Sequence, residues 1–180
     1  MGYNYSCIVI DRNIEGKVED FLEYNNVFVK TSSKSVAIES ALDGDQSKEI
    51  DAYFTDKGTI LFIPNEMSLQ YYNYPDTVVM TFSYYETTMA FTIFLSQDGK
   101  AIREIMEAEG EIHHEEGVPL TYEDGHNSIA DWIDEKVEDL TGFKMFSYDD
   151  DAMCVRYNIL KEKERKGFFA RLFSKLIKNF

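Results

Sequence analysis

The sequence predicts an α+β fold: an antiparallel, meander-rich sheet with two or three helices packed on one face, followed by a C-terminal amphipathic helix. Two observations carry this prediction. Apolar and polar residues alternate through most of the chain, as in strands with one buried face, and Gly or Asp residues mark the turns between them. One segment near residue 130 instead repeats its apolar residues at helical spacing. At 180 residues, 44% of them hydrophobic, the chain is large and apolar enough to enclose a core.

The N-terminal part of the chain predicts a strand, a helix and a series of hairpins. Residues 3–10 are rich in aromatic and β-branched side chains and predict the first strand. Asn13 is the predicted N-cap of a helix that ends near Tyr24, after which the chain returns as a strand. From there, short alternating stretches that include Val36 and Ile38 are separated by Asp- and Gly-containing turns, which predicts hairpins.

The second half of the chain carries the clearest patterns. Alternating apolar residues over 77–110, with a turn at Gly99, predict a three-stranded antiparallel meander. The segment from Ser128 to Leu140 has apolar residues at helical spacing and predicts the longest helix, with Ser128 as its N-cap and Gly142 as its stop. Alternation over residues 153–159 predicts the final strand.

One cluster, His113-His114-Glu115-Glu116, carries metal-type side chains. Neighbouring residues of a strand point to opposite faces, so adjacent histidines are poorly placed to share an ion, and the spacing matches no zinc motif. We therefore interpret the cluster as an exposed polar loop and expect no catalytic residue, no metal and no cofactor. The alternative is a small hydrolase or metal-dependent enzyme that uses carboxylates with His113 or His114; a divalent site that also includes His126 belongs to this alternative.

Charge divides the chain into residues 1–160 and residues 161–180. The tail holds seven Lys or Arg and two Glu, a formal charge of +5, so the −15 of the whole chain leaves −20 for the first part. An acidic surface repels a phosphate backbone and suits a basic protein partner. We therefore expect residues 1–160 to form an acidic α+β domain that binds protein and not nucleic acid.

The tail beyond Gly167 predicts a cationic amphipathic helix, because its apolar residues fall on one half of a helical projection and its cations on the other. Such a helix can pack on its own domain, as in a housekeeping protein, lie on an anionic membrane surface, or dock into a groove of a partner. The residues predicted to bind a membrane or a partner are Phe168, Phe169, Arg171, Leu172, Phe173, Lys175, Leu176, Ile177, Lys178 and Phe180.

Residues 92–123 resemble a hairpin found in several uncharacterised bacterial domain families. The resemblance rests on the turn at Gly99, on Arg103 in the following strand, and on the Gly-Val-Pro-Leu segment of residues 117–120 followed by Glu123. Some of these families are regarded as immunity proteins that accompany polymorphic toxins. The resemblance implies a bacterial cytosolic protein with a binding role, and it carries over no catalytic residue.

Together these observations predict a non-enzymatic, bacterial, immunity-like binding protein in the cytoplasm. Its tail would hold it at the inner membrane surface or at a protein partner. The N-terminus has no basic segment followed by a long apolar one, so no signal peptide is expected. Cys7 and Cys154 lie far apart within apolar runs and are expected to be buried thiols.

Overall fold

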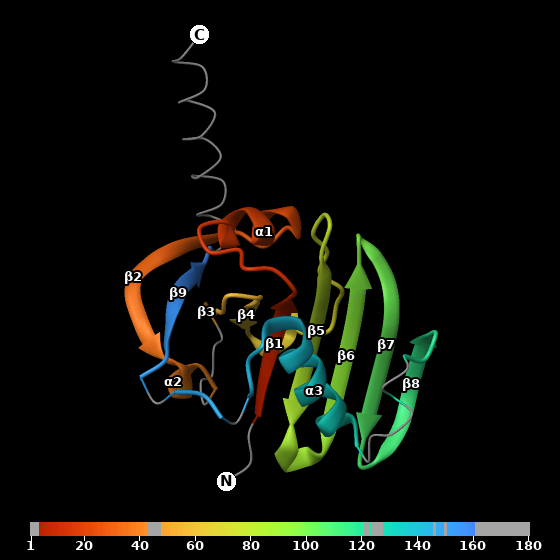
Figure 1. The fold of residues 1–180 in the computed structure, drawn as a ribbon. Coiled ribbons are helices and arrows are strands. Elements are labelled where there is room, and N and C mark those ends of the chain that lie inside the picture. Colours follow the sequence, from red (N-terminus) through yellow and green to blue (C-terminus); the bar gives the residue numbers. More distant parts are fainter. Residues whose placement is uncertain are drawn as a thin grey trace.

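A single antiparallel sheet dominates the computed structural model, which describes residues 4–42, 48–120, 123, 128–145, 147–149 and 151–160. Within these residues the sheet has nine strands in the order β2-β9-β3-β4-β1-β5-β6-β7-β8 (Figure 1). The strands are β1 Asn4–Ile10, β2 Val29–Ala37, β3 Glu49–Phe54, β4 Thr59–Phe62, β5 Val78–Tyr85, β6 Ala90–Gln97, β7 Lys100–Ala108, β8 Glu111–Gly117 and β9 Met153–Ile159. The helices are α1 Val18–Tyr24, α2 Ile38–Leu42 and α3 Ile129–Thr141, with short 3₁₀ turns at Asn65–Met67 and Glu86–Thr88.

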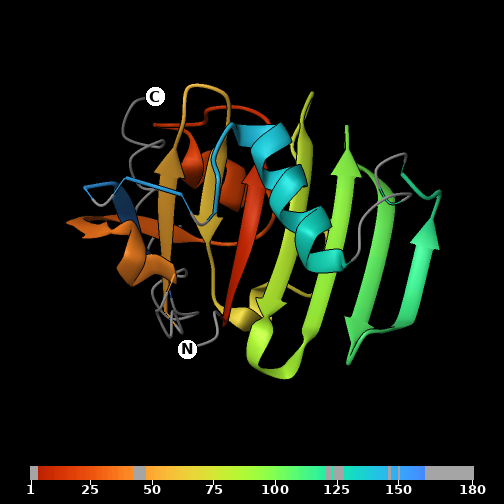
Figure 2. The same ribbon diagram turned by 60° about the horizontal axis from the view of Figure 1, so that its bottom comes forward.

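The central strand β1 separates two cores. Cys7 and Val9 belong to one core, Ile8 and Ile10 to the other, and all four are fully buried. Since alternate residues of a strand point to opposite faces, a strand that is apolar at successive positions must be covered on both sides. Helices α2 and α3 cover the first face and α1 covers the second (Figure 2). The α+β class is confirmed, but the prediction that the helices pack on one face is wrong.

The predicted meander is confirmed as β5, β6 and β7, which pair in succession. Strands β6 and β7 are joined through Asp98 and Gly99, both at positive φ (50° and 76°), as a tight hairpin turn requires. The meander then continues into β8, which forms the edge of the sheet. The interpretation of His113–Glu116 as a loop is therefore wrong: these polar residues are held in a strand by backbone pairing with β7.

Helix α3 begins and ends where the sequence predicts. The hydroxyl of Ser128 accepts a hydrogen bond from the backbone N–H of Asp131 at 3.2 Å, which caps the first turn. Gly142, at a φ of 72°, ends the helix and donates its N–H to the carbonyl of Glu138 at 2.7 Å. The helix packs on β1 and β5, and its buried side chains include Trp132, Ile133 and Val137.

Two local predictions in the N-terminal half are corrected. The first helix begins at Val18, and Asn13 is not its N-cap. The side-chain oxygen of Asn13 accepts a hydrogen bond from the N–H of Glu15 at 2.8 Å, and its side-chain amide donates to the carbonyl of Thr55 at 2.8 Å. This side chain closes a local turn instead of capping the helix. Ile38, which we expected in a strand, is buried and begins the short helix α2.

Candidate functional site

Helix α3 carries an acidic outer surface. Five of its thirteen residues are Asp or Glu and one is Lys, a formal charge of −4. Lys136 points inward, with its side chain only 8% exposed, and pairs with Asp139 at 3.0 Å. We call the five carboxylates the α3 acidic surface: Asp131, Asp134, Glu135, Glu138 and Asp139.

The position of two of these carboxylates opposes helix stability. Glu138 and Asp139 stand in the last turn of α3, where the helix dipole disfavours a negative charge by about 0.3–1 kcal/mol each. Cations from outside the helix offset part of this cost. Lys144 pairs with Glu138 at 3.3 Å, and the ammonium of Lys57 donates a hydrogen bond to the carbonyl of Asp139. The stability of α3 therefore does not explain why its C-terminal turn is acidic.

Asp134 is the most perturbed carboxylate of this surface. Burial raises the pKa of Asp134 from 3.8 to about 6, and the charge of Asp131 adds to the effect. Its Oδ1 atom is buried and has no hydrogen-bond partner among the described residues. Such a carboxylate gains from a proton or from an approaching cation more than an exposed one does.

A groove of about 400 Å³ lies between α3 and the β7–β8 hairpin. Ile105, Ile129 and Trp132 give it apolar walls, and Glu107 and Glu123 add carboxylates. Burial raises the pKa of Glu107 above its usual value. The groove therefore combines apolar contact area with negative charge at the N-terminal end of α3, where Asp131 of the α3 acidic surface stands.

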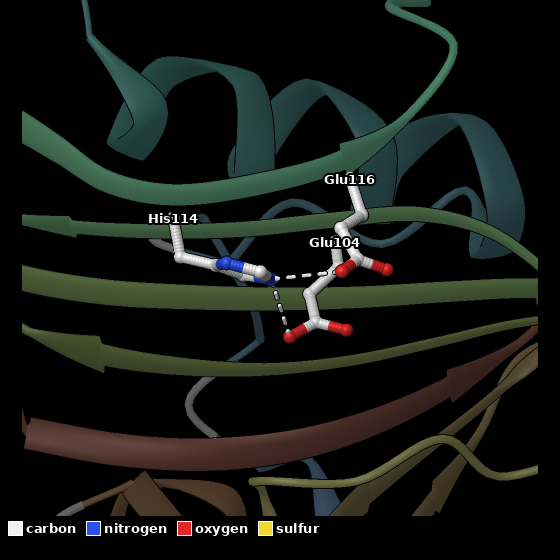
Figure 3. A group of neighbouring side chains, drawn as sticks. All are labelled: Glu104, His114 and Glu116. Carbon is white, nitrogen blue, oxygen red and sulfur yellow. Dashed lines mark ion pairs between the residues drawn. The ribbon is translucent and has the colours of Figure 1, made fainter.

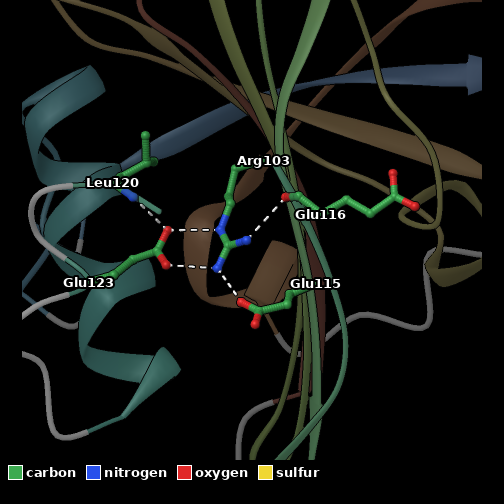
Figure 4. A network of polar contacts seen from close by, with 5 residues as sticks. All are labelled: Arg103, Glu115, Glu116, Leu120 and Glu123. Carbon is green, nitrogen blue, oxygen red and sulfur yellow. Dashed lines mark hydrogen bonds and ion pairs between the residues drawn. The ribbon is translucent and has the colours of Figure 1, made fainter. Parts of the chain in front are cut away.

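Arg103 closes one end of this groove with a network of ionic hydrogen bonds (Figure 4). Its guanidinium donates to both oxygens of Glu123 at 3.0 and 2.9 Å, to Glu115 at 2.6 Å, and to the carbonyl of Glu116 at 3.1 Å. Burial alone would lower the pKa of Arg103, but hydrogen bonds to Glu123 and Glu115 and their charges raise it above its usual value. Arg103 is thus a charged, 3% exposed anchor and offers no cation to a ligand.

The residues that carry the family resemblance have structural roles here. Gly117 has a φ of 89°, and a Cβ atom on it would lie 2.1 Å from the carbonyl oxygen of Ile102, so a side chain does not fit. The N–H of Leu120 donates to Glu123 at 3.0 Å, which holds that carboxylate for Arg103 (Figure 4). The Gly-Val-Pro-Leu segment and Glu123 together fasten the chain after β8 to β7.

A second group of polar side chains lies on the other face of the same hairpin, away from α3 (Figure 3). The Nε2 atom of His114 lies 3.2 Å from Oε1 of Glu104 and 3.9 Å from Oε1 of Glu116. The hydroxyl of Tyr71 donates to the second oxygen of Glu104 at 3.1 Å. One imidazole nitrogen and two carboxylates within 4.8 Å of one another are a ligand set that a divalent cation accepts.

A β-bulge changes which side chains of β8 share a face. Met106 is opposite His114 and Glu107 is opposite Ile112, so His113 is the extra residue. His113 lines a hollow of about 350 Å³ together with Met106, on the face that carries the His114 cluster. The expectation that adjacent histidines point to opposite faces therefore does not hold, although His113 is not among the clustered ligands of the described residues.

Cys7 and Cys154 are both buried and free, as predicted. Burial raises the pKa of the Cys7 thiol well above its usual value and that of Cys154 to about 12. Because the thiolate is the reactive form, neither residue is suited to be a nucleophile.

The remaining predicted site residues are not placed by the structure. The tail, residues 161–180, lies outside the described residues, as does His126. Among the helices of the described part of the chain, none is both long enough and apolar enough to cross a membrane. Comparison of the chain with protein-family models, curated proteins and solved structures found no match. The resemblance of residues 92–123 to immunity-associated domains thus stays a prediction.

Proposed function

We propose that this protein works by binding, and that the α3 acidic surface with the adjoining groove docks a basic protein partner. The observation that carries the proposal is the charge of α3: five carboxylates against one inward-pointing lysine. Glu138 and Asp139 stand where the helix dipole disfavours negative charge, and Asp134 keeps a carboxylate in a partly buried place. Carboxylates that lower the stability of the folded protein are expected at surfaces where they bind a partner.

The groove defines the partner more closely. Its apolar walls, which include Ile105 and Trp132, fit a large apolar side chain of a partner, and its carboxylates fit a neighbouring Lys or Arg of the same partner. The proposed partner is therefore a segment that carries both types of residue. Charge complementarity of this kind mainly accelerates association and is weakened by salt. It is also the chemistry of an immunity protein whose carboxylates occupy the nucleic-acid-binding surface of a basic toxin.

A labelled synthetic peptide of alternating Lys and Leu is a direct probe of this surface. The double variant Glu135→Gln/Glu138→Gln removes two carboxylates from α3. Each exposed ion pair is worth about 0.2–1 kcal/mol, so peptide affinity at low salt should fall about 2- to 30-fold. The matched control is Glu15→Gln/Glu23→Gln, which removes the same charge from two exposed positions, one just before α1 and one within it, on the other face of the sheet. Equal losses in the two variants would mean that only net charge matters and would contradict the proposal.

The tail has its own place in the proposal, as a cationic amphipathic helix that holds the protein at an anionic membrane surface. Its charge of +5 comes from seven basic and two acidic residues, with Phe and Leu on the opposite side of the helical projection. Deletion of residues 167–180 should leave the melting temperature of the domain unchanged and abolish co-sedimentation with vesicles of anionic lipid. Pelleting of both forms to the same extent, or a large loss of stability on deletion, would contradict this role.

A further inference from the structure

We propose that Glu104, His114 and Glu116 form a binding site for a divalent transition-metal ion of the Zn²⁺ class, on the face of β7–β8 away from α3 (Figure 3). The three residues supply one imidazole nitrogen and two carboxylate oxygens. Imidazole selects Zn²⁺ and its transition-metal neighbours over Ca²⁺ and Mg²⁺, which prefer oxygen ligands alone. This site is independent of the binding surface on α3.

The distances between the ligand atoms fit such an ion. In a tetrahedral site with bonds of about 2.0–2.1 Å, ligand atoms lie about 3.4 Å from one another. Nε2 of His114 is 3.2 Å from Glu104 and 3.9 Å from Glu116, and all three ligand atoms lie within 4.8 Å of one another. The side chain of Glu116 is 70% exposed, so a small rotation of it completes the set.

The pairing of the strands favours a cation at this place. Glu104 is directly opposite Glu116 in the ladder between β7 and β8. Two like charges at directly opposite positions of antiparallel strands destabilise the pair. A metal ion between them removes this repulsion, and His114, two residues before Glu116 on the same face, supplies the third ligand.

Tyr71 orients the least exposed of the three ligands. Its hydroxyl donates to Oε2 of Glu104 at 3.1 Å, while Oε1 of the same carboxylate points to His114. The ring of Tyr71 packs edge-on against Phe94 at 5.2 Å, which fixes the hydroxyl in place. An outer-shell donor of this kind is a usual companion of a metal-binding carboxylate.

One side of the site is open. His114 and Glu116 are 40% and 70% exposed, whereas Glu104 is only 15% exposed. The remaining coordination position therefore faces solvent, as in sites that hold a water or an exogenous ligand on zinc. The hollow lined by His113 and Met106 is on the same face.

Titration of the full chain, produced without a polyhistidine tag, with ZnCl₂ by calorimetry tests the site, and Co²⁺ absorption reports its coordination. Tyr71→Phe removes the outer-shell donor and should weaken Zn²⁺ binding by about 10- to 100-fold. His114→Gln removes a ligand and should weaken Zn²⁺ binding more, by over about 100-fold. His113→Gln is the matched control and should bind as the wild type does. Excess Mg²⁺ should not displace Zn²⁺.

Three results would overturn the proposal. If His114→Gln binds Zn²⁺ as tightly as the wild type, or if His113→Gln loses as much affinity as His114→Gln, the cluster is not the site. Urea unfolding of each variant confirms that it is folded. A wild type that shows no Zn²⁺ binding, with the fold intact, would leave His114 as a histidine that contacts two carboxylates and would end the proposal.

Discussion

Replacing Asp134 with Asn should stabilise the protein at neutral pH. Burial, with the charge of Asp131 added, raises the pKa of this carboxyl from 3.8 to about 6 in the folded protein. Between these two values the folded protein keeps a proton that the unfolded chain releases. The free energy of unfolding therefore falls as the pH rises from 3.8 to about 6, and it stays lower at higher pH. An Asn side chain has no charge to desolvate and removes this loss.

The size of the effect follows from the pKa of Asp134. The difference between 3.8 and about 6, at about 1.4 kcal/mol per tenfold change in proton affinity, sets an upper limit of about 3 kcal/mol. The residue is partly exposed, and solvent screens its charge, so we expect a gain of about 1–2 kcal/mol at pH 7. For a chain of this length, the melting temperature should rise by about 2–4 °C per kcal/mol.

Urea unfolding, followed by the fluorescence of the single tryptophan, measures this gain. The midpoint of Asp134→Asn should exceed that of the wild type at about pH 7 and converge with it near pH 4, while the slope stays constant. Glu135→Gln removes the same charge from an exposed neighbouring position and controls for the general charge of the helix. No gain at neutral pH, or a gain that is the same at both pH values, would refute the reasoning.

Three further substitutions test the framework, each by urea unfolding. Both Gly110 and Gly117 have a positive φ, and Gly110→Ala should cost about 1–2 kcal/mol of backbone strain. Gly117→Ala should cost more, because there, unlike at Gly110, the new Cβ would also collide with a backbone carbonyl. Arg103→Met should cost about 3–5 kcal/mol, since it removes a buried cation and leaves the mostly buried Glu123 without its ionic partner. Arg156→Met should cost a similar amount, about 3–5 kcal/mol, by removing the guanidinium that holds the fully buried Asp51 at 2.7 Å, and Asp51→Asn in the same chain should recover part of the loss.

The elements that were predicted correctly carry their signals within a short stretch of sequence. Helix α3 combines apolar residues at helical spacing with Ser128 at its start and Gly142 after its end. The β6–β7 hairpin has alternation on both sides of the turn at Gly99. In each case, local propensity and capping or turn chemistry agree, so tertiary contacts do not override them.

The elements that were missed depend on distant partners. Strand β8 is almost entirely polar, and no hydrophobic period reveals an edge strand that is held by backbone pairing. Which face α1 covers depends on the whole sheet, although the continuous apolar run from Cys7 to Ile10 already indicates that both faces of β1 are buried. A bulge at His113 leaves no trace in the sequence, yet it changes which histidines lie together.

The same distinction applies to the candidate sites. The net charge of the sequence showed that residues 1–160 are acidic. Only the structure shows that five carboxylates lie on α3 and that the side chain of Lys136 points inward. His114 and Glu116 were noted as metal-type residues, whereas Glu104 was not. A hairpin with its turn at Gly110 would by itself have placed Glu104 opposite Glu115. Only the bulge at His113 shifts the register to Glu116, so the cluster depends on a feature that the sequence does not reveal.

The groove and the proposed metal site share one framework, because they occupy opposite faces of the β7–β8 hairpin. Arg103 faces the groove, and its guanidinium donates to the backbone carbonyl of Glu116, whose side chain belongs to the metal cluster on the other face. Loss of Arg103 would therefore disturb both faces and could not assign a function to either. The α3 carboxylates and His114 lie on opposite faces of the sheet, so variants at these positions test the two proposals separately.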